Sequence, residues 1–442
     1  MQAYDIRARD SHIWRAMILA PLLVFALGAC DLSVSNPGPT EDRFLSDPAA
    51  FEALANGAGR ALADAMGAST GSMGFTMAQI SREVFPGGQT GSYGHTILQT
   101  RGFLDSSEVN GDWSGAHFAR ALAEEAVLRM REGFAADFAT SDVAAYGLLW
   151  VGYSNRFLGE NVCDAVIDGG PAENFLIHFT RAEAAFTEAL AVARAAGDAD
   201  YENAALAGRA SVRTWLGDWT GAVADAGLVP RDFEYLMHYN NLERSQNNSY
   251  FYAAQAPGSF RTITAWHTWY AENYDTFADP RTEYNTYADY PNTTGVLWDI
   301  GDGYGEYGLV PFYQSNKHLS YSSPIQLSDG KEAMLIVAEG RLRSGDWQGA
   351  LDIINDIRAE VGVALRAATT SEETWTWLKL EKAIELWLES RWAGERRRWY
   401  GDGTDGLAPG PWPALHNMED RPGRDRCIPI SESEWQTNPN LQ

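Results

Sequence analysis

Aromatic side chains are concentrated in one part of the chain. Residues 231–321 contain 21 aromatic side chains in 91 positions, whereas aromatics make up 12% of the whole sequence. The same segment is rich in Asn, Asp, Gly, Pro and Ser. Flat aromatic faces stack on the C–H faces of sugar rings, and Asn and Asp bind hydroxyl groups. The segment therefore indicates a ligand-binding surface, with packing of the loops onto helices as the alternative use of the same rings.

We predict the ligand contacts from this composition. Six lie in the aromatic segment and two in a Gly-rich segment nearer the N-terminus: Trp266, Trp269, Tyr270, Trp298, Tyr304, Tyr307, Tyr93 and Trp113.

Catalytic motifs are few, and their context is wrong. Residues 67–71 (GASTG) match G-x-S-x-G, but a nucleophile elbow requires a strand before the Ser, and the preceding ALADAM is helical in character. Residues 301–305 (GDGYG) follow no strand–helix–strand unit, so they predict a plain loop. We expect no catalytic residue and no cofactor.

Metal ligands are equally poorly supported. Two sets of acidic side chains could approach a Ca²⁺ ion, but neither set has the spacing of an EF-hand. They are Asp299, Asp302 and Glu306, and Asp402 with Asp405. We expect no metal site.

The first thirty residues resemble an export signal with a lipid-attachment site. Three arginines precede the apolar run Met17–Leu27, which is too short to span a bilayer as a helix. The run ends in Leu-Gly-Ala-Cys, which resembles a lipobox. We therefore expect a signal peptide over 1–29, a lipidated Cys30 and a tether over 30–47.

Cys163 and Cys427 are the remaining cysteines. In an oxidising compartment two such residues often form a disulfide, but they are far apart in sequence. A bridge and two separate buried thiols both remain open.

The net charge excludes some partners. The sequence carries 59 acidic and 34 basic side chains, a formal charge of −25. Such a surface repels nucleic acid and anionic lipid. We expect no nucleic-acid partner, and attachment to a membrane only through the lipid.

Helices are expected on both sides of the aromatic segment. Asp47 and Pro48 predict the start of a helix that continues over Ala49–Met66. Helical periodicity returns over His117–Gly133 and Asp142–Leu158, and the intervening residues 67–112 suggest an irregular surface.

An internal repeat predicts paired helices. Residues 210–222 and 338–350 share a small residue, a G-D-W turn and a following G-A at the same offsets, and residues 152–161 form a weaker third copy. Small residues that let two helices approach, followed by a Gly turn, are typical of tetratricopeptide pairs. The aromatic segment is inserted between the two clearer copies.

Several motifs occur in the order found in SusD/RagB outer-membrane lipoproteins. They are Cys-Asp-Leu with Asn-Pro after the lipobox, Asp279-Pro280-Arg281, residues 341–358 (RLRSGDWQGALDIINDIR), residues 385–399 (ELWLESRWAGERRRW) and the closing residues 427–440. The chain resembles this family, although Ser390 replaces the usual Gly and Glu395 the usual Asp.

The resemblance implies an all-α fold in which tetratricopeptide-like helical pairs form a superhelix beneath large irregular loops. It implies one domain over 48–442, with the scaffold at about 142–230 and 328–400 and the ligand-binding loops at about 67–113 and 231–321.

The resemblance also implies a function. Such proteins are not enzymes. They sit at the cell surface, anchored by lipid to the outer membrane, bind oligosaccharides or sometimes peptides, and pass them to a SusC-like TonB-dependent transporter. A periplasmic tetratricopeptide interaction scaffold and a secreted glycoside hydrolase are the alternatives that the residues leave open.

Overall fold

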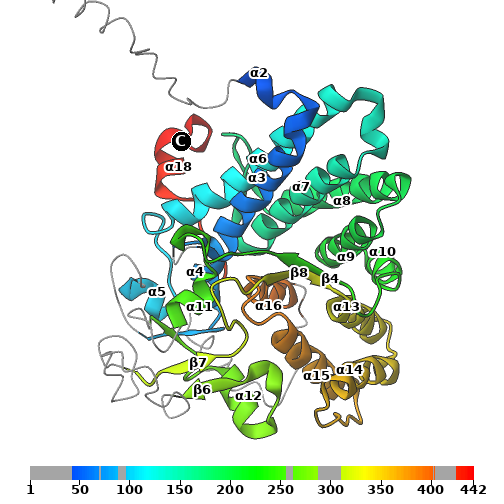
Figure 1. Ribbon diagram of the computed structural model, residues 1–442. Coiled ribbons are helices and arrows are strands. Elements are labelled where there is room, and N and C mark those ends of the chain that lie inside the picture. The colour runs from blue at the N-terminus through cyan, green and yellow to red at the C-terminus, as the bar shows by residue number, and fades with distance from the viewer. Residues whose placement is uncertain are drawn as a thin grey trace, which may run out of the picture. The chain divides into compact units, whose positions relative to one another are not determined.

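Figure 1 shows the computed structural model of the chain. It describes residues 42–68, 71–87, 96–254, 262–286, 310–401, 403 and 425–442. The chain divides into the units Met1–Leu45 and Ser46–Gln442. In the first unit, helix α2 (Asp42–Leu45) is the described element, and all other elements belong to the second.

A series of α-helices dominates the second unit, and each packs against the next (Figure 1). They are α3 (Phe51–Ala63), α6 (Asn110–Phe134), α7 (Asp142–Asn161), α8 (Leu176–Ala196), α9 (Ala199–Leu216), α10 (Trp219–Ala226), α13 (Gly330–Arg343), α14 (Trp347–Val361) and α15 (Ser371–Glu385). The predicted all-α, tetratricopeptide-like fold is confirmed, and α6 and α7 contain the two helices predicted over 117–133 and 142–158.

Shorter helices lie between and after these. They are η1 (Pro48–Ala50), η2 (Asp64–Ala68), α4 (Met73–Ile80), α5 (Ile97–Arg101), η3 (Ala135–Thr140), η4 (Arg244–Gln246), α11 (Ser249–Ala254), α12 (Trp269–Phe277), η5 (Pro280–Thr282), α16 (Trp392–Gly401), α18 (Glu432–Thr437) and η9 (Pro439–Leu441).

The strands are short, and the described ones pair antiparallel in four two-stranded sheets. The pairs are β1 (Phe85–Pro86) with β5 (Ile263–Thr264), β2 (Asp164–Val166) with β3 (Ala172–Asn174), β4 (Glu234–Met237) with β8 (Ile325–Asp329), and β6 (Tyr284–Thr286) with β7 (Tyr313–Ser315).

The two G-D-W sequences form the same turn. Gly217 and Gly345 adopt left-handed φ values of 76° and 90° at the ends of α9 and α13. Each following aspartate, Asp218 or Asp346, then accepts a hydrogen bond from the backbone N–H three residues on, at 2.9 and 3.0 Å. Only glycine adopts this φ without steric cost, and aspartate is a preferred N-cap. The predicted helix–turn–helix repeat is confirmed.

The weaker third copy is wrong, because residues 152–161 lie inside one continuous helix, α7. Its glycines serve close packing instead of a turn. A Cβ at Gly152 would lie 2.5 Å from the Phe186 ring, and one at Gly159 would lie 2.8 Å from the Phe179 ring. Both rings belong to α8, so the glycines let α7 and α8 approach each other.

The N-terminal helix begins as predicted. The Asp47 carboxylate accepts a hydrogen bond from the Ala49 N–H at 3.0 Å, and helical turns follow through η1, α3 and η2. At the end of this run Gly67 leaves the helical conformation with φ −169°.

The prediction of an irregular surface over 67–112 is wrong for α4, because all eight residues of this helix are buried. The sequence of α4, MGFTMAQI, is apolar on nearly every face. Gly74 permits the close fit, since a Cβ there would lie 2.2 Å from the Met66 carbonyl oxygen and 2.3 Å from the Ser390 hydroxyl.

Cys163 and Cys427, whose pairing the sequence left open, form a disulfide with a Cα–Cα distance of 5.0 Å. The backbone joins the same segments, because the Ile428 N–H donates to the Asn161 carbonyl at 2.7 Å. The C-terminal segment is therefore fixed to the end of α7.

The described ranges contain neither a candidate membrane span nor a candidate metal cluster. Within them, no helix combines the length and the apolar character needed to cross a bilayer. Nor do three or more His, Cys, Asp or Glu side chains gather there at metal-binding distances. The acidic groups considered for Ca²⁺ (Asp299, Asp302, Glu306, Asp402 and Asp405) lie outside the described residues, as does Cys30.

Candidate ligand-binding site

The aromatic insertion rests on the two small sheets β1–β5 and β6–β7. The Thr264 hydroxyl links them, because it donates to the Pro311 carbonyl at 3.1 Å and accepts from the Tyr313 N–H at 2.8 Å. The Ala265 N–H also donates to the Tyr313 carbonyl, at 2.8 Å. Strands β5 and β7 are thus held side by side. Trp266 follows Ala265 directly in the chain.

Trp266 is half-buried, as a stacking platform for a ligand should be. Its ring meets Phe85 edge to face with the centroids 5.3 Å apart, and its backbone N–H donates to the Thr264 hydroxyl at 3.1 Å. The contact with β1 positions the indole, while part of its surface stays open to solvent. Of the predicted ligand contacts that the structure describes, this one has the expected exposure.

A second pair of half-buried rings lies on β6 and β7. Tyr284 and Tyr313 stack in parallel, with centroids 4.5 Å apart and an interplanar angle of 1°. The Tyr284 hydroxyl donates to Asp275 at 2.8 Å, and burial together with this carboxylate raises the pKa of Tyr284. Tyr284 therefore stays neutral and can offer its ring face beside a hydrogen-bond acceptor.

Amide and carboxylate groups surround this tyrosine pair. The Asn285 amide donates to the Asn316 side-chain oxygen at 2.9 Å, and the Tyr274 hydroxyl donates to Glu283 at 3.2 Å. Ring faces next to amides and carboxylates are the chemistry that binds polyhydroxylated ligands. The sequence placed these tyrosines in the aromatic segment but did not single them out, because exposure is decided by the fold.

Three predicted contacts are wrong, because their side chains are buried. Tyr270 has no exposed surface and stacks on Trp387 at 4.6 Å with an angle of 9°. Trp269 is 4% exposed, and Trp113 is 2% exposed and packs on His117 at 4.4 Å. All three rings are packed in the interior, and for Trp269 and Tyr270 this is the packing use that the sequence left open.

Four predicted contacts, Tyr93, Trp298, Tyr304 and Tyr307, lie outside the described residues. They belong to segments 88–95 and 287–309, which continue the chain beyond β1 and β6. They remain predictions.

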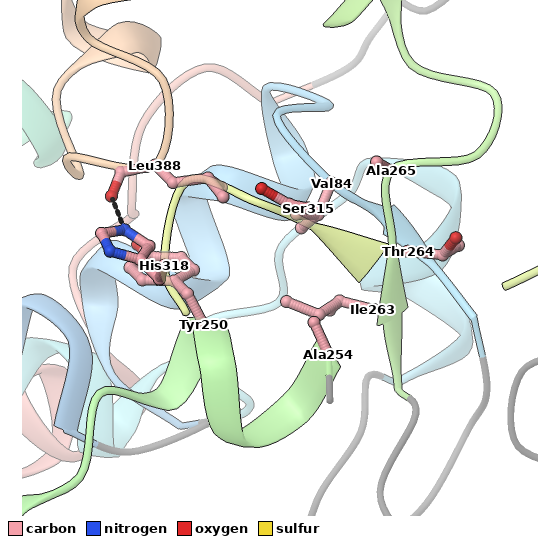
Figure 2. A pocket seen from close by; sticks show the side chains of 9 residues that line it. All are labelled: Val84, Tyr250, Ala254, Ile263, Thr264, Ala265, Ser315, His318 and Leu388. Carbon is pink, nitrogen blue, oxygen red and sulfur yellow. Dashed lines mark hydrogen bonds between the residues drawn. The ribbon is translucent and has the colours of Figure 1, made fainter. Parts of the chain in front are cut away.

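A small cavity lies beneath the sheets (Figure 2). Its volume is about 10 Å³, which is room for one water molecule at most. Figure 2 shows His318 beside Tyr250, with the His318 Nε2 atom 3.2 Å from the Leu388 carbonyl. Burial, with a smaller effect from Lys317, lowers the pKa of His318 to about 4, so the ring is neutral and Nε2 is the donor. The cavity is a packing feature and is too small for a ligand.

Buried ion pairs fix the insertion to the helical scaffold. Arg281 of the Asp-Pro-Arg motif pairs with Asp279 at 2.7 Å and with Glu385 at 2.6 Å. Arg358 of the residue 341–358 motif pairs with Glu381 at 2.8 Å, and Glu381 also binds Arg281. These ion pairs therefore position β6 and its tyrosine relative to α15.

The catalytic alternative at residues 67–71 has no structural support. Gly67 and Ala68 close a helical run that begins with α3, so a helix and not a strand leads toward Ser69. A nucleophile elbow needs the strand. Ser69 itself lies outside the described residues.

Comparison of whole structures identifies the fold. A laminarin-binding SusD-like protein superposes with a TM-score of 0.66 and 13% identity over 90% of this chain and 98% of its own. A SusD-like carbohydrate-binding protein from Bacteroides fragilis gives 0.64 and 14% over 90% and 100%. A SusD superfamily protein from Bacteroides vulgatus gives 0.60 and 15% over 90% and 98%.

The fold is that of SusD-like proteins, as the motifs indicated. No protein-family model matches the sequence, and no curated protein is significantly similar to it.

Proposed function

We propose that the chain is a surface lipoprotein that binds nutrient oligomers, chiefly glycans, and delivers them to a TonB-dependent transporter of the outer membrane. The SusD-like fold supports the proposal, because two of the proteins that share it are described as laminarin-binding and carbohydrate-binding. The lipobox ending in Cys30 supports the anchor.

The observation that carries glycan binding is the exposure of the ring that follows β5 and of the rings on β6 and β7. Trp266, Tyr284 and Tyr313 are half-buried, whereas the neighbouring Trp269 and Tyr270 are fully packed. A ring that only joins loops to helices is covered on both faces. Trp266 instead keeps accessible surface while one edge of its ring system contacts Phe85 of β1.

We expect binding without catalysis. The described part of the site offers ring faces, amides and carboxylates that already bond to tyrosine hydroxyls. An acid–base pair for glycoside hydrolysis requires two carboxyl groups at a defined separation across a sugar. Asp275 and Glu283 instead orient Tyr284 and Tyr274.

The test is a binding panel of soluble polysaccharides, including laminarin, and of peptides against the chain lacking residues 1–30. Binding is followed by calorimetry and products by chromatography. We expect saturable glycan binding with no product. Trp266→Ala should weaken binding by about 1–3 kcal/mol, the range measured for loss of a stacking ring on a base.

Trp435→Ala is the matched control. Trp435 is 44% exposed but lies on α18, away from the two sheets, so its loss should leave affinity unchanged. Equal effects of the two substitutions, or release of shorter sugars, would contradict the proposal.

Delivery and location need the intact chain. The full-length protein with Cys30 is co-expressed with the transporter encoded by a neighbouring gene. It should be accessible to protease on whole cells and should co-purify with the transporter. Cys30→Ser should abolish the anchoring and leave glycan affinity in solution intact. Retention of the Cys30→Ser protein at the membrane would contradict lipid anchoring.

A further inference from the structure

A groove of about 750 Å³ lies among α3, α7, α9 and β4, outside the ligand-binding site described above. Pockets that hold ligands in proteins have volumes of roughly 300–1,000 Å³. None of the predicted ligand contacts that the structure describes lines it. Its walls come from α3, from two helices of the predicted scaffold, α7 and α9, and from β4, the first strand after α10.

The groove is strongly acidic. Glu52, Asp142, Asp200 and Glu234 line it, and none of the four has a salt-bridge partner in the described part of the chain. Arg60, the arginine in the wall, is already bound to Asp64 at 2.6 Å and to the Ser245 carbonyl. The groove therefore has a negative potential that its own side chains do not neutralise.

Aromatic rings form one wall. Tyr146 and Tyr201 stack with centroids 5.4 Å apart and an angle of 14°, and Trp150 meets Tyr146 edge to face at 5.3 Å. Burial, then Tyr146 and the nearby carboxylates, raises the pKa of Tyr201 to about 12, so the hydroxyl stays neutral. Neutral ring faces beside carboxylates bind ammonium and guanidinium groups well.

The strand β4 supplies a backbone edge. Residues 234–238 all line the groove, and within the described chain β4 is paired with β8 alone. The alternate N–H and C=O groups on the other side of such a strand are available to a further strand. An extended peptide can add to an exposed edge, so that its main chain gives affinity and its side chains give specificity.

We propose that this groove binds an extended, lysine- or arginine-containing segment of a partner protein, which adds to β4 as a third strand. Its basic side chains pair with Glu52, Asp200 and Glu234 and lie against the Tyr146–Tyr201 wall. The site is separate from the glycan site, so one molecule can hold both ligands.

The probe is a fluorescent hexapeptide of alternating Lys and Val, titrated with the chain lacking residues 1–30 and followed by anisotropy at low ionic strength. We expect saturable binding that weakens with added salt. The same peptide with Glu in place of Lys should not bind.

Charge specificity is tested with matched triple variants. Glu52→Gln/Asp200→Asn/Glu234→Gln removes three groove charges and should weaken binding about tenfold or more. Glu173→Gln/Asp352→Asn/Glu372→Gln removes three exposed charges elsewhere and should change it less than about twofold. Equal losses would show nonspecific attraction to an acidic protein and overturn the proposal.

Strand addition is tested through the peptide backbone. Two versions of the peptide are N-methylated at alternate residues, one at the odd and one at the even positions. The version that loses the N–H donors facing β4 should not bind. Retained affinity for both methylated peptides would overturn strand addition. Glycan binding should be the same in both triple variants, so failure of the peptide site and failure of the glycan site give different results.

Discussion

At the scale of single residues, a buried carboxylate holds the turn after α15. Glu83 accepts hydrogen bonds from the Leu388 N–H at 2.7 Å and the Ser81 hydroxyl at 2.9 Å. Leu388 and Ser390 have left-handed φ values of 56° and 63°. Ser390 replaces the usual Gly of the SusD/RagB-like motif at residues 385–399, and its hydroxyl donates to the Met66 carbonyl at 3.1 Å.

The first prediction concerns pH. Burial raises the pKa of Glu83 from 4.5 to about 7, against the hydrogen bonds that lower it. A raised native pKa gives stability that is complete below about pH 4.5 and is lost as the pH rises through about 7. Glu83→Gln should therefore remove a decline on the order of 2–3 kcal/mol in the free energy of unfolding over this interval.

Urea denaturation at several pH values measures this decline. The exposed Glu132→Gln is the control and should keep the wild-type dependence. Parallel stability curves for Glu83→Gln and the wild type would show that Glu83 does not titrate in this window.

At the scale of elements, the motifs that resemble those of SusD/RagB proteins form ion pairs that hold elements of the chain together. Arg281 connects η5, within the aromatic insertion, to Glu381 and Glu385 on α15. Asp279 and Glu381 are buried, and their negative charges are balanced by Arg281 together with Arg358. Strand β6, which carries Tyr284, follows η5 in the chain.

The second prediction follows from that dependence. Arg281→Met leaves Glu385 without its ion-pair partner among the described residues and leaves Asp279 and Glu381 with Arg358 alone. It should lower the free energy of unfolding by about 3–5 kcal/mol. Arg341→Met breaks the exposed pair with Asp346 and should cost less than about 1 kcal/mol. Chemical denaturation of both variants measures the difference. Similar small losses in the free energy of unfolding would mean that Arg281 does not hold the insertion to α15.

Elements defined by local chemistry were predictable from the sequence, and elements defined by their surroundings were not. The turns at Gly217 and Gly345 need a left-handed glycine and a capping aspartate, both of which are local. Helix α4 was missed because its burial depends on Met66 and Ser390. Tyr270 was misassigned because Trp387, distant in sequence, covers its ring.

At the scale of the whole molecule, one covalent bond joins distant parts of the chain. Cys163 and Cys427 are separated by 264 residues, and their bridge fixes the C-terminal segment beside α7. A bond that closes so long a loop restricts the unfolded chain strongly.

The third prediction concerns this bridge. Cys163→Ala/Cys427→Ala should lower the free energy of unfolding by roughly 3–5 kcal/mol. A reductant should bring the wild type down to the same level and leave the double variant unchanged. A reductant effect on the double variant would mean that the loss has another source.

Sites formed by the whole fold were only partly accessible from sequence. The aromatic composition located the insertion, and Trp266 has the expected exposure. The acidic groove was missed, because Glu52, Asp200 and Glu234 come from three elements that meet only after folding. Tyr146 and Tyr201 lie in helices whose pattern indicated scaffold alone.

Arg391 has a consequence for how the molecule unfolds. In a row of stacked helices each member touches only its neighbours, and such arrays can lose their ends one repeat at a time. Arg391 instead binds Glu160 of α7, Ser211 of α9 and Glu332 of α13 with one buried guanidinium. Fraying of any of these helices would expose the charges of the others, so the row behaves cooperatively and resists partial opening.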